Sequence, residues 1–287
     1  TAMADTVLTM TGVDKSFRRT PVLQDCVFSV ERGTVTALVG SNGAGKSTLM
    51  SLAVGLLRPD RGEVIVLGQR VGQRGIYPGL SYLAQHKPLY PRLTVKEMLH
   101  FGRSTNPSWN HDYATELVDA ADISMSAKIK SLSPGHRTRV ALALALGRRP
   151  ELLLLDEPLA DLDPVARRDV ARTLMRDAAE HGTTIVLSSH VLSELIEVAD
   201  QLLLLREHRI RLAGAIDDIT DDHYLMAGSG DPAAAAQGGS VIAEINGPSG
   251  TAFVVHGTRP AVAPGWRIDD ATLDDVVLAH LRARSVS

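Results

Sequence analysis

The sequence predicts an α/β fold with a largely parallel sheet, into which a helical subdomain is inserted. Two observations support this prediction. Short apolar stretches rich in β-branched residues recur along the chain, and longer segments with helical spacing lie between several of them. Strands that alternate with helices in this way are typical of a parallel sheet covered by helices. The block from residue 86 to about 135 departs from the alternation, because it has helical patterns without a strong strand.

The expected strands share an apolar and often β-branched composition. They cover residues 7–13, 34–40, 63–68, 79–83, 152–156, 183–189 and 202–205. The expected helices share apolar residues at helical spacing. They cover residues 47–57, 94–103, 111–121, 136–147 and 164–181. Pro88, Pro91 and Pro107 open and break the helical block, because proline interrupts regular backbone hydrogen bonding.

The sequence pattern in the last part of the chain predicts a small α/β extension. Residues 228–240 are small and Gly-rich, which favours a surface connection. Beyond them, residues 241–245 and 251–257 predict two strands. The segment that follows Thr272 predicts an amphipathic closing helix with this threonine as its N-cap. The expected divisions are 1–85 and 141–219 for the two parts of the core, 86–140 for the helical subdomain, and 220–287 for the extension.

Composition and charge exclude several classes of protein. The chain has 287 residues, 44% of them hydrophobic, and a formal charge of −3, so there is no electrostatic case for nucleic-acid binding. The single cysteine, Cys26, has no partner for an internal disulfide, which fits a reducing compartment. The first residues lack a signal-peptide pattern, residues 1–4 resemble an expression remnant, and no apolar run approaches the roughly 20 residues that span a bilayer. We therefore expect a soluble protein.

Residues 40–48 read GSNGAGKST and fit the phosphate-binding pattern G-x-x-x-x-G-K-[ST]. The stretch follows an expected strand and opens an expected helix, as this pattern requires, so a chance Gly-rich turn is disfavoured. Its glycines let backbone N–H groups point at phosphate oxygens, and the helix N-terminus adds its dipole. We expect Lys46 at the β- and γ-phosphates of a nucleoside triphosphate, Ser47 on Mg²⁺ and Thr48 at the α-phosphate. The predicted nucleotide-binding residues of this loop are Gly40, Ser41, Asn42, Gly43, Ala44, Gly45, Lys46, Ser47 and Thr48.

A pair of acids follows the strand of four leucines at 152–155. We expect Asp156 to hold Mg²⁺, directly or through water, and Glu157 to act as the general base for an attacking water. Acids at a strand end also cap helices or face solvent in other proteins. The phosphate-binding loop in the same chain favours the catalytic interpretation.

A third motif, LSPGH at residues 132–136, lies shortly before the acidic strand. Together with the two motifs above, it resembles the nucleotide-binding subunits of ABC transporters, whose signature loop has the form LSGGQ. Leu132, Ser133 and Gly135 match this form, whereas Pro134 and His136 depart from it. The resemblance implies that the loop starts a helix and that Ser133 and Gly135 face the γ-phosphate of ATP held by a second subunit. Proline is tolerated in the first helical turn, so Pro134 is not expected to break the loop.

The resemblance covers residues 7–215 approximately and implies further site residues. Gln85 matches the glutamine that senses Mg²⁺ and links the core to the helical subdomain. His190 matches the histidine that contacts the γ-phosphate. Asp163 is implied to reach across the dimer interface, although it also fits an N-cap of the next helix. Phe17 matches the aromatic residue that stacks on adenine, although an aromatic residue beside a strand is also common in a core.

The resemblance also implies how such a subunit works. Two subunits, identical or paralogous, sandwich two ATP molecules with Mg²⁺ and drive a separate integral-membrane permease. The expected location is the cytoplasm, peripheral on the inner face of the cell membrane. The segments LTVKEMLHFGR and TLDDVVLAHL are similar to an exporter subfamily with separate type-2 permease subunits.

Two other interpretations remain open at this point. One is a soluble ABC-type ATPase in DNA maintenance, translation or cofactor assembly. The single cassette, the lack of a long heptad region or cysteine-pair zinc module, and the lack of a basic stripe disfavour it. The other is a weakly hydrolysing regulatory module, which steady-state ATPase activity would separate from an active ATPase.

Overall fold

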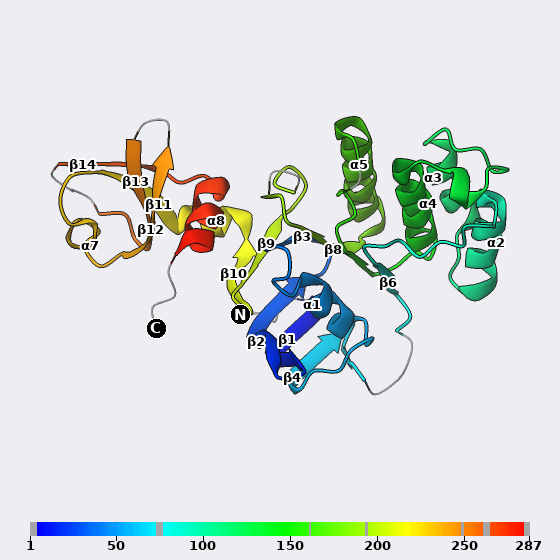
Figure 1. Cartoon of the computed structure of the whole chain (residues 1–287), viewed down its shortest axis with the longest axis horizontal. Coiled ribbons are helices and arrows are strands. Elements are labelled where there is room, and N and C mark those ends of the chain that lie inside the picture. The colour runs from blue at the N-terminus through cyan, green and yellow to red at the C-terminus, as the bar shows by residue number, and fades with distance from the viewer. Residues whose placement is uncertain are drawn as a thin grey trace.

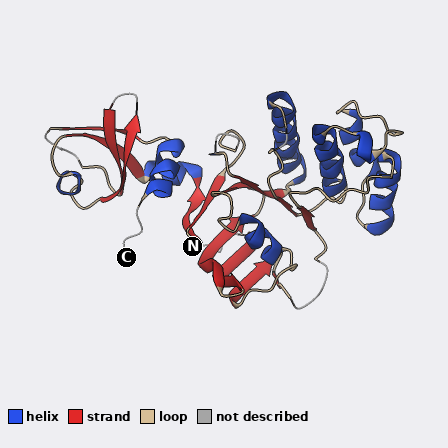
Figure 2. Ribbon diagram, viewed as in Figure 1, coloured by secondary structure: helices blue, strands red, loops and turns tan. Residues whose placement is uncertain are grey.

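The computed structural model describes residues 5–72, 77–160, 162–192, 195–247, 250–260 and 265–283. The expectation for residues 1–4 lies outside these ranges. Figure 1 shows an α/β core in the middle, a helical subdomain on one side and the C-terminal extension on the other. Figure 2 shows that strands dominate the core and the extension, while helices form the end of the molecule that lies opposite the extension. Within the described ranges, no helix has the length and apolar character to cross a membrane.

The central sheet has six strands in the order β10-β9-β3-β8-β7-β6. Neighbouring strands from β9 to β6 pair in parallel, and β10 pairs antiparallel with β9 at one edge. The strands are β3 (Val35–Val39), β6 (Leu80–Leu83), β7 (Leu152–Leu155), β8 (Thr184–Ser189), β9 (Gln201–Arg206) and β10 (Arg209–Ala215). Every residue of β3, β7 and β8 is buried, because both faces of the sheet are covered. Because these three strands run parallel, their carboxyl ends meet at one edge of the sheet.

A second sheet packs over one face of the core together with α1 (Lys46–Ala53). It is antiparallel in the order β2-β1-β4-β5, with β1 (Thr6–Phe17), β2 (Thr20–Glu31), β4 (Arg61–Val66) and β5 (Gln69–Arg70). The sequence did not predict β2. Its buried residues Leu23, Cys26, Phe28 and Val30 are interleaved with exposed residues, most of them polar, so it lacks the continuous buried run of the core strands.

Helices cover the other face of the central sheet, where side chains from β3, β7 and β8 pack against α4 (Pro134–Leu146) and α5 (Pro164–His181). The helical subdomain consists of α2 (Val95–Thr105), α3 (His111–Asp119), a 3₁₀ turn (Ile129–Ser131) and α4 (Pro134–Leu146). The expected boundary at residue 140 falls inside α4. This helix begins two residues before the expected start, because Ser133 caps it and Pro134 occupies its first turn.

The extension contains more structure than the two strands and one helix that the sequence predicted. Its antiparallel sheet has the order β12-β13-β11-β14. The elements after the core are α6 (Ile216–Asp221), β11 (His223–Gly228), α7 (Pro232–Ala235), β12 (Ser240–Gly247), β13 (Gly250–His256), β14 (Trp266–Asp270) and α8 (Leu273–Arg282). The interpretation of 228–240 as a mere connection was incomplete, because α7 forms there with Asp231 as its N-cap.

Helix α8 joins the extension to the core. Thr272 caps it as expected, in a reciprocal capping box with Asp275. Its buried residues Leu273, Val276 and Val277 belong to the same apolar cluster as the helices on the central sheet. The extension is therefore held to the α/β core through a continuous apolar contact.

Candidate functional site

The phosphate-binding loop connects β3 to α1, as the motif requires. Gly45 precedes α1 with a left-handed φ of 112°, and a Cβ at this position would lie 2.9 Å from the carbonyl oxygen of Val22. A Cβ at Gly40 would lie 2.5 Å from the carbonyl oxygen of Leu205. Both positions therefore need glycine, because the loop passes too close to neighbouring backbone for any side chain.

Lys46 lies at the start of α1, and its side chain is only 6% exposed. Its ammonium donates to the carbonyl oxygens of Gly40 at 2.7 Å and Ser41 at 3.3 Å. The ammonium also lies 3.2 Å from Oε1 of Glu157. The loop thus folds back on its own lysine and places a buried positive charge beside the acid that follows β7.

The acid pair sits at the carboxyl end of β7, beside β8. Glu157 has a left-handed φ of 49°, and its Oε2 lies 2.9 Å from Nδ1 of His190, which follows β8. The Ser188 hydroxyl donates to Oδ1 of Asp156 at 2.8 Å and accepts the backbone N–H of Glu157 at 2.9 Å. Ser188 thus orients both acids. Sequence reasoning missed it, although the Ser-Ser-His run at the end of the predicted strand was a usable signal.

A cavity of about 410 Å³ brings the predicted residues together. Val22 of β2 and Ala160 also contribute, and neither was predicted. Lys46, Glu157 and His190 converge here from β3–α1, β7 and β8. Gly40, Ser41, Ala44 and Asp156 are not among the residues that line it. The cavity is lined by Val22, Asn42, Gly43, Gly45, Lys46, Ser47, Thr48, Gln85, Glu157, Ala160 and His190.

The donor set fits a magnesium ion. Mg²⁺ prefers oxygen ligands and usually binds through one or two protein groups, waters and phosphate oxygens. Ser47, with its hydroxyl, and Gln85, with its amide, both line the cavity, and the buried residue Asp156 lies directly before Glu157. No group of three or more His, Cys, Asp or Glu side chains within the described ranges forms a metal cluster by itself. A magnesium site here therefore relies on nucleotide oxygens as further ligands.

Phe17 ends β1 outside this cavity. Its side chain is 44% exposed, and the Lys15 ammonium lies 5.6 Å from the ring centroid. A ring that is this accessible does not serve the core, so the interpretation of Phe17 as a core residue is not favoured.

The residues expected to act on a second subunit's nucleotide do not line this cavity. Ser133 starts α4, and its hydroxyl accepts the backbone N–H of His136 at 3.1 Å. Asp163 starts α5, where its carboxylate accepts the N–H groups of Val165 and Ala166. The hydrogen bond from Ala166 is the largest cause that lowers the pKa of Asp163. A single chain therefore does not bring Ser133, Gly135 and Asp163 to its own Lys46.

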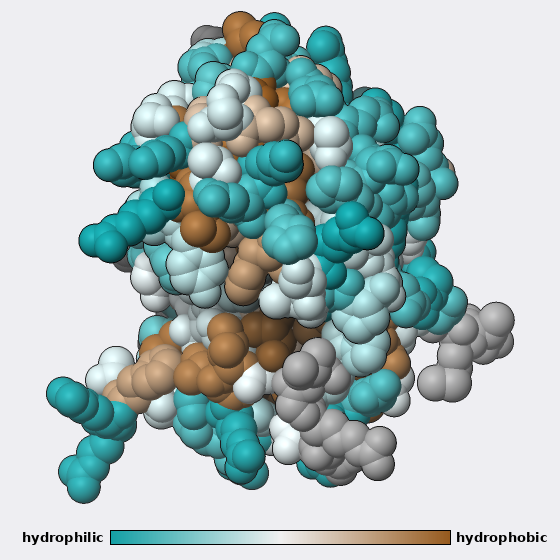
Figure 3. Space-filling view, turned by 90° about the vertical axis from the view of Figure 1, so that its right-hand side faces the viewer, coloured by the Kyte–Doolittle hydropathy of each residue, from teal (hydrophilic) through white to brown (hydrophobic). Residues whose placement is uncertain are grey.

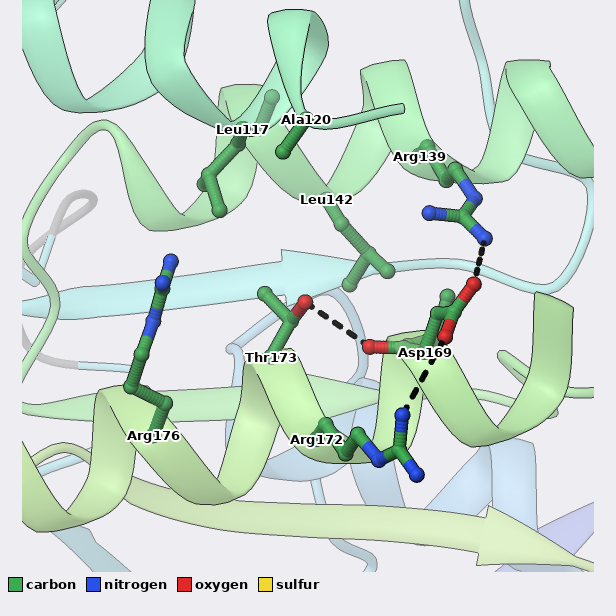
Figure 4. A pocket seen from close by; sticks show the side chains of 10 residues that line it. Leu117, Ala120, Arg139, Leu142, Asp169, Arg172, Thr173 and Arg176 are labelled. Carbon is green, nitrogen blue, oxygen red and sulfur yellow. Dashed lines mark hydrogen bonds and ion pairs between the residues drawn. The ribbon is translucent and has the colours of Figure 1, made fainter. Parts of the chain in front are cut away.

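A separate cavity of about 310 Å³ lies between α3, α4 and α5 (Figure 4). Arg139 of α4 donates to the Asp169 carboxylate of α5 at 2.9 Å, and Arg172 lies 3.9 Å from the same carboxylate. The first of these contacts joins α4, which starts in the LSPGH loop, to α5, which follows Asp163. The cavity therefore marks the junction between the helical subdomain and the core.

Comparison with known families gives two matches. The family model described as ABC transporter matches residues 23–160. A second model, described as an AAA domain and putative AbiEii toxin of a type IV toxin–antitoxin system, matches residues 128–196. The first match covers the phosphate loop, the LSPGH loop and the acid pair, so it includes most of the residues that line the cavity.

Individual relatives agree with this match. An Fe(3+) ions import ATP-binding protein from Pseudomonas fluorescens is 38% identical over 216 residues, which are 72% of this chain and 61% of that protein. A lipopolysaccharide export system ATP-binding protein from Haemophilus influenzae is 29% identical over 76% of this chain and 95% of that protein. The chain thus spans about three fifths of the iron import protein.

Solved structures establish the fold class. The ATP-binding subunit of an ABC transporter matches with a TM-score of 0.67 and 28% identity over 75% of this chain and 92% of that chain. A dimeric bacterial ABC transporter cassette matches with a TM-score of 0.65, and its 20% identity supports the fold alone. The predicted α/β fold of the P-loop NTPase class is confirmed.

Proposed function

We propose that this chain contains an ATP-binding domain of the ABC transporter family and that it hydrolyses ATP to drive a separate membrane permease, as its similarity to such subunits supports. The observation that carries the proposal is the convergence of Lys46, Glu157 and His190 in one cavity. Such a site holds the parts that phosphoryl transfer to water needs: a phosphate-binding cation, a carboxylate base and a group that orients the base.

In the proposed mechanism, the N–H groups of the loop and Lys46 hold the phosphates, and Glu157 accepts a proton from the attacking water. His190 keeps the carboxylate of Glu157 in place through its contact at 2.9 Å. Ser47, Gln85 and Asp156 are the residues that would hold Mg²⁺, which would neutralise phosphate charge when bound. Ser188 fixes the backbone of Glu157 and the carboxylate of Asp156.

The position of Ser133, Gly135 and Asp163 outside the cavity supports dimerisation as part of the mechanism. The N-terminus of α4 carries a serine hydroxyl, a glycine and a helix dipole, which together suit an anion. We propose that two chains pair head to tail, so that each supplies this helix terminus to the ATP held by the other. The partner chain is a second copy of this chain or a paralogue.

The surface between the core and the helical subdomain is the proposed docking site for the permease. A cavity of about 420 Å³ there is lined largely by apolar and aromatic residues, including Tyr90 and Phe101, which are 54% and 43% exposed. Figure 3 looks onto this side of the molecule and shows apolar side chains gathered between polar ones. Docking of this kind places the chain on the cytoplasmic face of a membrane.

The direction of transport is a separate question. The sequence segments predicted an exporter, but this prediction finds no support in the relatives. Several of them are named for import of iron or sulfate, and one for export of lipopolysaccharide. Export therefore stays a prediction from sequence segments, and the permease decides the transported molecule.

The decisive experiment measures ATP binding and turnover in Glu157→Gln. The variant keeps the shape of the side chain but removes the base, so we expect retained ATP binding and turnover reduced by about 10²-fold or more. Glu116→Gln, at an exposed ion pair with Arg176, is the control and keeps full turnover. Unchanged turnover in Glu157→Gln would remove this acid from its role.

The membrane partner is tested by co-purification of the chain from detergent-solubilised native membranes, followed by mass spectrometry. A multi-span permease in the eluate is the expected result. If only soluble proteins co-purify reproducibly, the transporter proposal fails and a soluble ABC-type ATPase takes its place.

A further inference from the structure

Lys46, which is proposed to bind the nucleotide phosphates, forms a buried ion pair with Glu157. An ammonium group has three N–H donors. Three oxygens surround the ammonium of Lys46: the carbonyl oxygens of Gly40 at 2.7 Å and Ser41 at 3.3 Å, and Oε1 of Glu157 at 3.2 Å. A phosphate that reaches this lysine therefore has to replace one of these oxygens.

Of the three partners, Glu157 is the one that an arriving phosphate displaces. The two carbonyl oxygens belong to the loop that wraps the lysine, so they move only if the loop unfolds. The carboxylate of Glu157 has a second partner in Nδ1 of His190 at 2.9 Å, which can keep it after Lys46 is lost. A phosphate and a carboxylate also repel each other, and side chains of 6% and 7% exposure are poorly screened by water.

We propose that Glu157 is the resting counter-ion of Lys46 and that an incoming phosphate exchanges places with it. This inference rests on the proposed function and adds a regulatory step to the same site. The acid that serves as base is held by the lysine while the phosphate position is empty. Its carboxylate becomes free to accept a proton from water only when a phosphate has taken over the lysine. Arrival of the substrate thus activates the base.

The exchange predicts that Glu157 lowers the affinity of the site for phosphate groups. The probe is inorganic pyrophosphate without Mg²⁺, because it contacts the loop without a base, a sugar or a metal. We expect Glu157→Gln to bind pyrophosphate about tenfold more tightly than the unaltered chain, measured by isothermal titration calorimetry. Glu116→Gln changes the net charge equally at a side chain that is 60% exposed, and we expect no change in affinity.

A second variant separates the contact from the charge. Glu157→Asp keeps the negative charge but shortens the side chain by one methylene, so it cannot hold Lys46 and His190 at the same time. We expect it to bind pyrophosphate more tightly as well, by a smaller factor than the glutamine variant. This variant also provides the test if the glutamine variant does not fold.

Two results overturn the exchange. One is unchanged pyrophosphate affinity in both variants. The other is tighter binding in the glutamine variant with unchanged binding in the aspartate variant, because charge alone would then explain the effect. If the unaltered chain binds neither pyrophosphate nor ATP, the proposed function itself fails. This outcome differs from a failure of the exchange alone, because it is seen in the unaltered chain before any variant is compared.

Discussion

Ser188→Ala provides a sharp test of how the acid pair is held. The Ser188 hydroxyl is fully buried, donates to the carboxylate of Asp156 at 2.8 Å and accepts the N–H of Glu157 at 2.9 Å. Loss of a hydrogen bond to a charged group costs about 1.5–3 kcal/mol, and a buried N–H left without an acceptor costs about 1–3 kcal/mol. Partial relaxation reduces the sum, so we expect a loss of about 3 kcal/mol in the free energy of unfolding.

The matched control is Ser81→Ala. Ser81 is also buried in a core strand, but its hydroxyl makes one hydrogen bond, to the neutral carbonyl oxygen of Ala145 at 3.1 Å. That substitution is expected to cost about 1 kcal/mol. Urea unfolding monitored by circular dichroism compares the two variants, and equal slopes against urea concentration validate the comparison.

The same substitution also tests function. Without Ser188, the left-handed backbone of Glu157 and the Asp156 carboxylate lose their common anchor, so we expect ATP turnover to fall about tenfold or more. Ser81→Ala lies away from the cavity and is expected to retain turnover. Equal costs in unfolding free energy for the two variants, together with full turnover in Ser188→Ala, would refute the assigned role.

Two further predictions concern the edges of the site and the extension. Phe17→Ala is expected to weaken ATP binding about tenfold, because stacking of a base on an aromatic ring contributes about 1–3 kcal/mol. Pyrophosphate has no base, so its affinity in calorimetry is expected to stay constant. Equal losses of affinity for both ligands would contradict stacking. Burial lowers the pKa of His280 to about 4 and lowers the pKa of His223, and their Nε2 atoms lie 3.2 Å apart. Because the unfolded chain then binds more protons between about pH 6.5 and 4, the free energy of unfolding is expected to fall as pH drops through this window. Urea unfolding at several pH values should show that the free energy of unfolding changes less with pH in His280→Asn than in the unaltered chain. Identical dependence on pH would exclude His280 as a source of the effect.

The local motifs were predictable because their physics is local. A glycine-rich loop between a buried strand and a helix needs only neighbouring residues to form an anion site, so the sequence predicts Lys46 as a phosphate ligand without knowledge of the fold. The same holds for the capped starts of α5 and α8, whose N-cap residues Asp163 and Thr272 satisfy backbone N–H groups two or three residues ahead. The strands buried on both faces were also predictable from their continuous apolar runs.

Other features depended on partners that are distant in the sequence. The strand β2 and the edges of the extension carry mixed polar and apolar residues, whose meaning depends on which face another element covers. Val22 and Ser188 become site residues only because β2 and β8 pass beside the loop and the acid pair.

The sequence by itself predicted the chemistry of the site: which residues would bind phosphate, which acid follows the buried strand, and which loop starts α4. Only the tertiary structure decided that Lys46 and Glu157 contact each other and that Ser133 lies outside the cavity of its own chain. The physical reason is that residue type and spacing govern backbone conformation and charge over short distances. Sheet order, in contrast, brings the ends of β3, β7 and β8 to one edge.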